Sequence, residues 1–222
     1  KQMGVKKIKF IGNLKFSQNN FVNHNLNKNF KKFMNSKKLW CAVSTHPGEE
    51  ELCVNVHYKL LKKFSNLVLI IIPRHAERAE SLSRDLSKFN LEQHIHSSKK
   101  PINKNTKIYI VDTYGETSLF FKICKPVFLG KSLTVDGGQN PLEPARDNCA
   151  IIHGPMVSNF AEIYKYLDNQ KISFKIKNSS EFYKRLLSIM ENKKNISKIK
   201  NKINLVGSEV LKKSLNEIES LI

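Results

Sequence analysis

The chain has 222 residues, which is enough for one substantial α/β domain or two small ones. Hydrophobic residues make up 40% and charged residues 26%, a composition typical of a soluble globular protein. Collagen-like, disulfide-framework and wholly disordered chains are excluded. No membrane span is expected, because the longest aliphatic run is Leu67–Pro73 and a bilayer requires roughly 18 apolar residues. Lys6, Lys7 and Lys9 interrupt the first apolar stretch, so we expect no signal peptide.

The formal net charge of +19 is concentrated at the two ends of the sequence. Residues 1–38 contain 10 lysines and no acidic residue, residues 170–222 carry a charge of +7, and residues 39–169 carry only +2. Three interpretations stay open: lysine-rich compositional drift, attraction to an anionic membrane surface, and nucleic-acid binding. Nucleic acid is the least favoured partner, because arginine is scarce and no helix-turn-helix or aromatic RNA-binding pattern accompanies the lysines.

Strands and helices are predicted to alternate along most of the chain. Residues 5–11 alternate weakly as a strand does, and a polar linker follows them. From residue 39 onward, apolar runs predict strands at 39–44, 67–72, 92–96, 107–111, 126–129, 150–153 and 172–176. Helices are predicted between them, from a start near Pro47 to about residue 63, then at 76–88, 115–124, 140–148 and 159–168, followed by two C-terminal helices.

This alternation predicts an α/β fold with a Rossmann-like, mainly parallel sheet and helices on both faces. In such sheets ligands bind beyond the carboxyl ends of the strands. Four polar segments fall at these ends and open helices: 44–51 (STHPGEEE), 72–78 (IPRHAER), 112–116 (DTYGE) and 137–146 (GGQNPLEPAR). Backbone N–H groups and helix dipoles would then point into one crevice, which suits a phosphate or carboxylate ligand.

The candidate side chains of the second and third segments each have a functional and a structural interpretation. Arg74 directly follows a strand, where its guanidinium can clamp a phosphate with two hydrogen bonds, or it forms a surface ion pair with Glu77 or Glu80. Gly115 allows a ligand to approach the backbone closely. Glu116 is either part of the site or a surface acid that favours the helix N-terminus.

The fourth segment also has two interpretations. Asn140 suits an N-cap, Pro141 suits the first helical position, and Glu143 is spaced as a capping-box partner. Alternatively, the Glu143 carboxylate accepts hydrogen bonds from two sugar hydroxyls, while Gly137 and Gly138 let the loop fold tightly over the ligand.

No metal or nucleophile motif accompanies these segments. His46 and His75 are candidate acid–base groups, but neither belongs to an HExxH or paired-histidine motif. The sequence has no GxSxG, P-loop or GxGxxG, so it does not support a hydrolase, a kinase or a classical dinucleotide-binding protein. Buried reduced thiols and no structural zinc are expected, because no CxxC occurs among Cys41, Cys53, Cys124 and Cys149.

The four segments together, with 137–164 read as GGQNPLEPARDNCAIIHGPMVSNFAEIY, closely resemble the 3-deoxy-D-manno-octulosonic acid (Kdo) transferases of lipopolysaccharide synthesis. The match covers roughly residues 12–168 in the family's order and spacing. It is the combination that is specific, because any one segment alone would be weak. One departure is visible: the family usually has Gly-Gly-Ser where this chain has Gly130, Lys131 and Ser132, and Lys131 either narrows the pocket or adds a phosphate contact.

The resemblance implies the C-terminal, donor-binding half of a two-domain GT-B glycosyltransferase. The family transfers Kdo with inversion from CMP-Kdo to a lipid A precursor, as a peripheral enzyme at the cytoplasmic face of the bacterial inner membrane. Residues 1–38 would be the lysine-rich end of the N-terminal domain and the interdomain linker. Residues 39–195 would be the CMP-sugar-binding Rossmann-like domain and 196–222 a C-terminal helix.

The resemblance also implies which residues contact the donor: Pro73, Arg74, Tyr114, Gly115, Glu116, Asn140, Pro141, Leu142 and Glu143. No residue is assigned as catalytic, because the family's base is a glutamate of the N-terminal domain, so the fragment alone is expected to be soluble and inactive. CMP-Kdo is the only nucleotide implied, with no metal or other cofactor. The partners implied are the lipid A precursor and the protein's own N-terminal domain. The alternatives are a GT-B domain for another sugar nucleotide and a basic module that binds membrane or nucleic acid.

Overall fold

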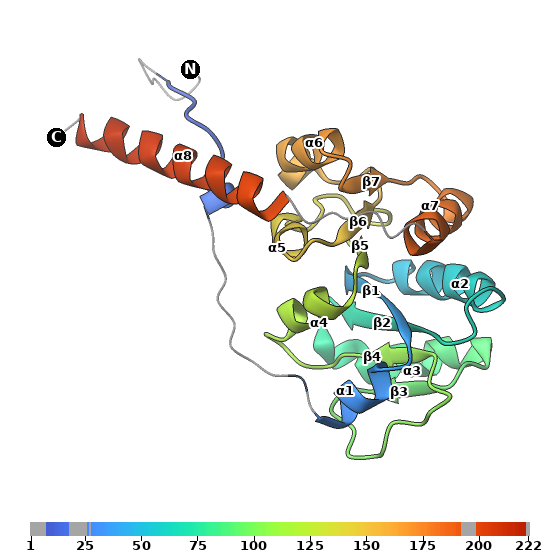
Figure 1. Ribbon diagram of the computed structural model, residues 1–222. Coiled ribbons are helices and arrows are strands. Elements are labelled where there is room, and N and C mark those ends of the chain that lie inside the picture. Colours follow the sequence, from blue (N-terminus) through green and yellow to red (C-terminus); the bar gives the residue numbers. More distant parts are fainter. Residues whose placement is uncertain (1–7, 18–25, 27, 192–198, 221–222) are drawn as a thin grey trace.

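The computed structural model describes residues 8–17, 26, 28–191 and 199–220. Seven strands form one fully parallel sheet in the order β3-β4-β2-β1-β5-β6-β7 (Figure 1). The predicted mainly parallel sheet is confirmed, with strands at β1 (Lys38–Thr45), β2 (Leu67–Pro73), β3 (Gln93–Ile95), β4 (Ile108–Ile110), β5 (Pro126–Leu129), β6 (Ala150–His153) and β7 (Ser173–Lys175).

Helices cover both faces of the sheet, as predicted, and each face has its own hydrophobic core. One face is covered by α1 (Lys28–Met34), α4 (Thr117–Ile123), α5 (Leu142–Arg146), α6 (Ala161–Asn169) and α8 (Ile199–Glu219). The other face is covered by α2 (Glu49–Leu61), α3 (Ala79–Leu86) and α7 (Ser179–Glu191). Short 3₁₀ turns are η1 (Leu14–Ser17), η2 (Ala76–Arg78), η3 (Ser87–Phe89) and η4 (Ser158–Phe160).

The strand side chains alternate between the two cores. In β2, Val68, Ile70 and Ile72 pack into one core, and Leu67, Leu69 and Ile71 pack into the other. Every residue of β2 is buried. This two-sided burial explains why the strand is a continuous apolar run in the sequence, since a parallel strand is covered on both faces.

The N-terminal region differs in part from the expectation. Residues 8–13 have no regular structure, so the predicted strand at 5–11 does not form over 8–11, and residues 5–7 lie outside the described part. Within the predicted linker, α1 forms and buries Phe30 against the rings of Tyr109 and Phe120, at centroid distances of 4.5 and 5.7 Å. The division of the chain into domains stays a prediction, but α1 packs on the same sheet as the rest.

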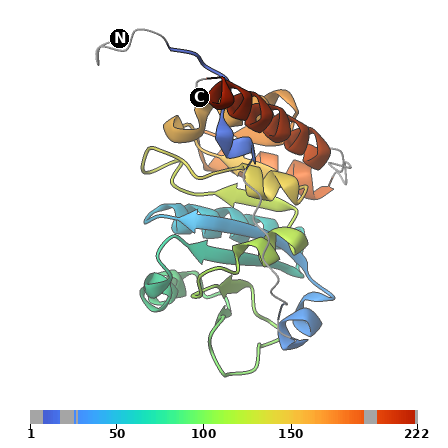
Figure 2. The ribbon, with the colours of Figure 1, turned by 90° about the vertical axis from the view of Figure 1, so that its left-hand side faces the viewer.

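The long C-terminal helix α8 lies beside η1, far from it in sequence (Figures 1 and 2). Phe16 of η1 is 5% exposed and packs edge-to-face on Tyr166, and its carbonyl oxygen accepts a hydrogen bond from Arg146 at 2.7 Å. A Cβ at Gly207 would lie 2.3 Å from the same oxygen, so only glycine permits this close approach. None of the described helices, α8 included, is long and apolar enough to cross a membrane.

Replacing Gly207 by alanine is expected to lower the free energy of unfolding by about 1–3 kcal/mol, because the methyl group overlaps the Phe16 carbonyl. Intrinsic helix propensity predicts the opposite sign, a gain of about 1 kcal/mol. Urea denaturation of Gly207→Ala decides between them, with Asn216→Ala on the exposed part of α8 as the control. A stabilised Gly207→Ala variant would contradict the contact.

Candidate functional site

The strand-end segments meet at one edge of the sheet, as the parallel topology requires. The Arg74 N–H after β2 donates to the Thr45 carbonyl at the end of β1, at 3.1 Å. The rings of His46 and His75 lie 6.3 Å apart. Three of the four segments are thus joined by direct contacts, since the Tyr114 hydroxyl after β4 accepts a hydrogen bond from the Ala76 N–H after β2 at 3.2 Å.

Glu49, the first residue of α2, organises the crevice between the ends of β1 and β5. Its side chain is fully buried, and its carboxylate accepts hydrogen bonds from the backbone N–H groups of His46, Lys131, Ser132 and Leu133 at 2.8–3.0 Å. Gly130 packs closely against the same groups, because a Cβ there would lie 2.5 Å from the Ser44 carbonyl oxygen and 2.7 Å from the Glu49 carboxylate. Glu49 therefore fixes the loop after β5 and occupies N–H groups that would otherwise be free for an anion.

The sequence did not reveal this role of Glu49. The sequence predicts only that the helix starts near Pro47. The helix instead starts at Glu49, after Gly48 with φ +90°. The partners at 131–133 are more than 80 residues away, so no local spacing signal points to the contact.

Arg74 is exposed at the end of β2, and among the described residues its guanidinium has no ion pair or hydrogen bond. The surface ion pair with Glu77 or Glu80 is therefore wrong. Glu77 instead accepts a hydrogen bond from the Tyr114 hydroxyl at 2.8 Å and contacts His75 at 3.4 Å. In the same segment, Arg78 does form an ion pair: its guanidinium lies 3.0 Å from the buried carboxylate of Glu50.

The segment after β4 places a glycine and a carboxylate at the same edge. Gly115 has φ +83°, which favours glycine, and the space where its Cβ would lie is open. Glu116 is not a free surface acid, because its carboxylate contacts His96 Nε2 at 3.2 Å and accepts a hydrogen bond from the Thr113 hydroxyl. His96 contacts the Tyr109 hydroxyl through Nδ1 at 2.7 Å, which fixes the orientation of its ring.

The fourth segment is built differently from the prediction. Helix α5 begins at Leu142, so Pro141 precedes the helix and is not its first residue, although the Asn140 side chain still caps the helix by accepting a hydrogen bond from the Leu142 N–H at 3.1 Å. The Leu142 side chain is fully buried, so only its backbone can reach a ligand.

Glu143 makes no capping-box hydrogen bond within the described part of the chain. Its side chain is half-buried, and burial together with the neighbouring charge of Asp147 raises its carboxyl pKa, while Arg146 opposes this rise. Among the described residues, 140–143 have no hydrogen bond or ion pair to the other three segments. The structure thus brings Pro73, Arg74, Tyr114, Gly115 and Glu116 into one connected group, and within the described residues 140–143 make no direct hydrogen bond to it.

The other candidate groups do not form a metal centre. The described residues contain no group of three or more His, Cys, Asp or Glu side chains that could hold a metal ion. The prediction of buried free thiols is confirmed for Cys41, Cys53, Cys124 and Cys149.

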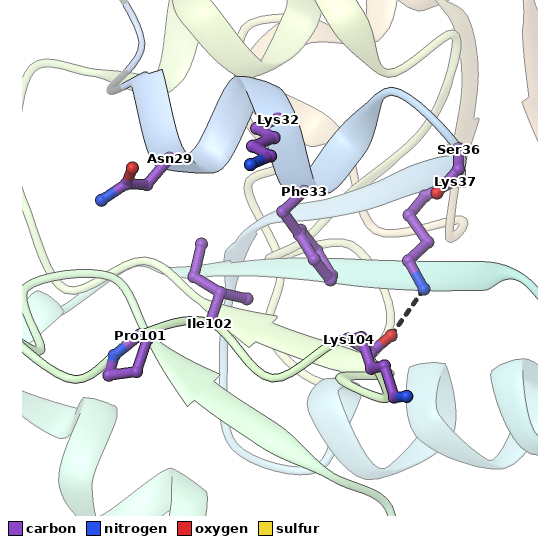
Figure 3. A pocket seen from close by; sticks show the side chains of 8 residues that line it. All are labelled: Asn29, Lys32, Phe33, Ser36, Lys37, Pro101, Ile102 and Lys104. Atoms are coloured by element: carbon purple, nitrogen blue, oxygen red, sulfur yellow. Dashed lines mark hydrogen bonds between the residues drawn. The ribbon is translucent and has the colours of Figure 1, made fainter.

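Two surface hollows lie away from the strand-end crevice. One, of about 500 Å³, lies between α1 and the segment before β4, where Phe33 and Ile102 project into the space and Lys37 Nζ donates to the Lys104 carbonyl at 2.7 Å (Figure 3). The other, of about 830 Å³, lies at the end of α3. Neither is lined by a predicted site residue, and at the strand-end edge the side chains of Arg74, His75 and Tyr114 are exposed.

The fold is that of a GT-B glycosyltransferase C-terminal domain, the class that the sequence predicted. The C-terminal CMP-Kdo binding domain of WaaA from Acinetobacter baumannii superimposes with a TM-score of 0.65 over 82% of this chain and 93% of that domain, at 24% sequence identity. No protein-family model matches the chain.

The chain is homologous to the Kdo transferases over nearly its whole length, which confirms the resemblance. It is 29% identical over 97% of its residues to the 3-deoxy-D-manno-octulosonic acid transferase of Haemophilus influenzae, and 30% identical over 89% to that of Rickettsia prowazekii. These alignments cover 50% and 43% of the relatives, so the chain spans about half the length of the curated relatives that it matches.

Replacing Glu49 by glutamine is expected to lower the free energy of unfolding by about 2–4 kcal/mol. The amide group of glutamine presents donors to backbone N–H groups that need an acceptor, and the site is fully buried. Urea denaturation measures the loss, with Glu51→Gln as the matched control, because Glu51 is exposed and has only a surface ion pair with Lys88. A loss no larger than that of Glu51→Gln would contradict this role of Glu49.

Proposed function

We propose that this chain is the donor-binding domain of an inverting glycosyltransferase that transfers Kdo from CMP-Kdo to a lipid A precursor. The observation that carries the proposal is the exposed, unpaired guanidinium of Arg74 at the strand-end crevice, in a chain homologous to Kdo transferases. An unpaired arginine beside the start of η2 and an open glycine turn at 115 suit the phosphate of a nucleotide.

The proposed reaction is a direct displacement at the anomeric carbon of the sugar. A hydroxyl oxygen of the lipid acceptor forms the new bond, the bond from the anomeric carbon to the phosphate oxygen breaks, and CMP leaves with the electron pair. Arg74 would stabilise the charge that develops on the departing phosphate, which is electrostatic preorganisation. The hydroxyl proton would pass to a base in an N-terminal domain, which the resemblance to the family implies.

Glu143 and Glu116 would take the remaining parts of the donor. The half-buried Glu143 carboxylate has no hydrogen-bond partner among the described residues, so its oxygens are available to two ribose hydroxyls. The Glu116 carboxylate is held by His96 and Thr113 next to the Gly115 turn. Pro73 is buried and would contribute through its backbone.

The intact protein would act at the cytoplasmic face of a bacterial inner membrane as a peripheral enzyme, because its lipid acceptor is made there. The lysine-rich residues 1–38 and 170–222 would add attraction to anionic headgroups.

Charge reversal of exposed lysines in these segments should therefore weaken binding to anionic vesicles.

Calorimetry with CMP and UMP at moderate salt tests the nucleotide site. The chain is expected to bind CMP selectively, and Arg74→Ala is expected to weaken CMP binding at least about tenfold, because a charge-assisted bidentate contact is lost. Arg84→Ala, on the exposed face of α3, is the matched control and should bind as the wild type does. Unchanged CMP affinity in Arg74→Ala would contradict the assignment, and preference for UMP would favour another sugar nucleotide.

Because Glu143 has a raised pKa, CMP affinity is expected to fall as the pH decreases, starting above the usual range of a glutamate. The ionised carboxylate accepts two hydroxyl hydrogen bonds, and protonation removes acceptor capacity. The affinity ratio of wild type to Glu143→Gln should shrink toward one on acidification. Because the CMP phosphate titrates in the same way with both variants, its effect cancels in this ratio. Exposed Glu162→Gln is the control, and a pH-independent ratio would exclude this role of Glu143.

Sugar transfer is not expected from the chain alone, since no residue here is assigned as the base. Incubation with CMP-Kdo and a lipid A precursor should give no product above background. Measurable turnover by the chain itself would show that a base lies within it and would overturn this part of the proposal.

A further inference from the structure

Lys131 adopts a backbone conformation that is unusual for a lysine. It follows β5 with φ +55°, in the left-handed region that favours glycine. Its N–H donates to the Glu49 carboxylate at 2.8 Å, and its carbonyl accepts a hydrogen bond from the Gly138 N–H at 2.9 Å. The backbone is therefore held from both sides, and any residue other than glycine at this position has to accept the strain.

The Lys131 side chain lies over the neighbouring glycine turn. A Cβ built at Gly137 would lie 3.3 Å from Lys131 Cε and 3.4 Å from Nζ. Because the adjacent loop passes this close, the ammonium is held near the crevice and does not extend freely into solvent; the residue is only half-exposed.

The Lys131 ammonium has no ion pair or hydrogen bond among the described residues. The two nearby carboxylates are already engaged, Glu49 by backbone N–H groups and Asp136 by the Ser158 N–H and hydroxyl, the latter at 2.8 Å. Fixed but unpaired positive charge in a polar crevice is the arrangement that recognises an anion.

His46 adds a second group to the same place. Its Nε2 is buried and has no hydrogen-bond partner within the described residues. Burial lowers the pKa of His46, Glu49 opposes this change, and the positive charges of Lys131, His75 and Arg78 add to the lowering. Lys131, His75 and Arg78 thus all lie close enough to His46 to affect its protonation, and its neutral ring has a nitrogen available as a hydrogen-bond donor.

We propose that Lys131 and His46 form a subsite for an oxyanion of the donor, at the ends of β5 and β1 and in addition to Arg74. This inference rests on the proposed function, because a CMP-linked sugar acid has two such groups, the phosphate and the carboxylate. The strain at Lys131 supports it, since the side chain has no hydrogen bond or ion pair within the described part of the chain that would compensate for a conformation that glycine adopts more easily.

Calorimetry with cytidine, CMP and CMP-Kdo tests the subsite on the wild-type chain, Lys131→Met, Lys131→Arg and Lys131→Gly. Lys131→Met keeps the length of the stem and removes the charge, and it is expected to lose at least about tenfold in affinity for CMP-Kdo. Lys131→Arg should restore most of this affinity. Lys165→Met, on the exposed side of α6, is the matched control and should bind as the wild type does.

The ligand series identifies the anionic group. A loss for CMP and CMP-Kdo but not for cytidine assigns the phosphate, and a loss for CMP-Kdo alone assigns the carboxylate; both support the subsite. Lys131→Gly should have a thermal midpoint equal to or above that of the wild type while also losing affinity, because glycine relieves the strain. A merely structural lysine would lower the midpoint and leave affinity unchanged.

The outcomes separate this inference from the proposed function. If the wild type binds CMP in an Arg74-dependent manner and Lys131→Met binds each of the three ligands as tightly as the wild type does, the subsite is wrong and the proposed function stands. If the wild type binds neither CMP nor CMP-Kdo, both are overturned.

Discussion

The buried carboxylate of Glu49 is the contact on which the strand-end crevice depends. It lies at the start of α2 and accepts hydrogen bonds from the turn after β1 and from the loop after β5, so it joins segments that the chain separates by more than 80 residues. A charged group without water is costly to bury, and several backbone donors compensate for that cost. Without this contact, the backbone N–H groups of Lys131 and Ser132 would lose the acceptor that joins their loop to α2.

This arrangement divides the polar groups of the crevice into two classes. One class is already paired within the protein: the Glu49 carboxylate with the backbone N–H groups of 131–133, and the Glu50 carboxylate with Arg78. Arg74 and Lys131 keep unpaired positive charges within the described residues. In the proposed site, anion binding would therefore rest on these two side chains and on the turns around them, more than on the loop N–H groups that a strand-end geometry first suggests.

Particular residues show how far sequence reasoning reached. The apolar runs located all seven strands of the sheet within a few residues, and the motif order identified the family to which the chain is homologous. Errors occurred where a long-range contact overrides a local preference. The surface-acid alternative for Glu116 is wrong because His96 contacts its carboxylate, and α1 reads as a linker but buries Phe30 against Tyr109. In both cases the partner comes from another element, which no local pattern encodes.

The amino-acid pattern alone specifies the alternation of apolar strands and helices, and hence a parallel sheet with its polar segments at one edge, because the period of hydrophobic residues and the position of glycine and proline are local properties. Which charges at that edge are free is visible only in the folded chain. Pairing depends on distances between residues far apart in the chain, and these distances are set by the strand order and by close approaches such as that of Gly207 to Phe16.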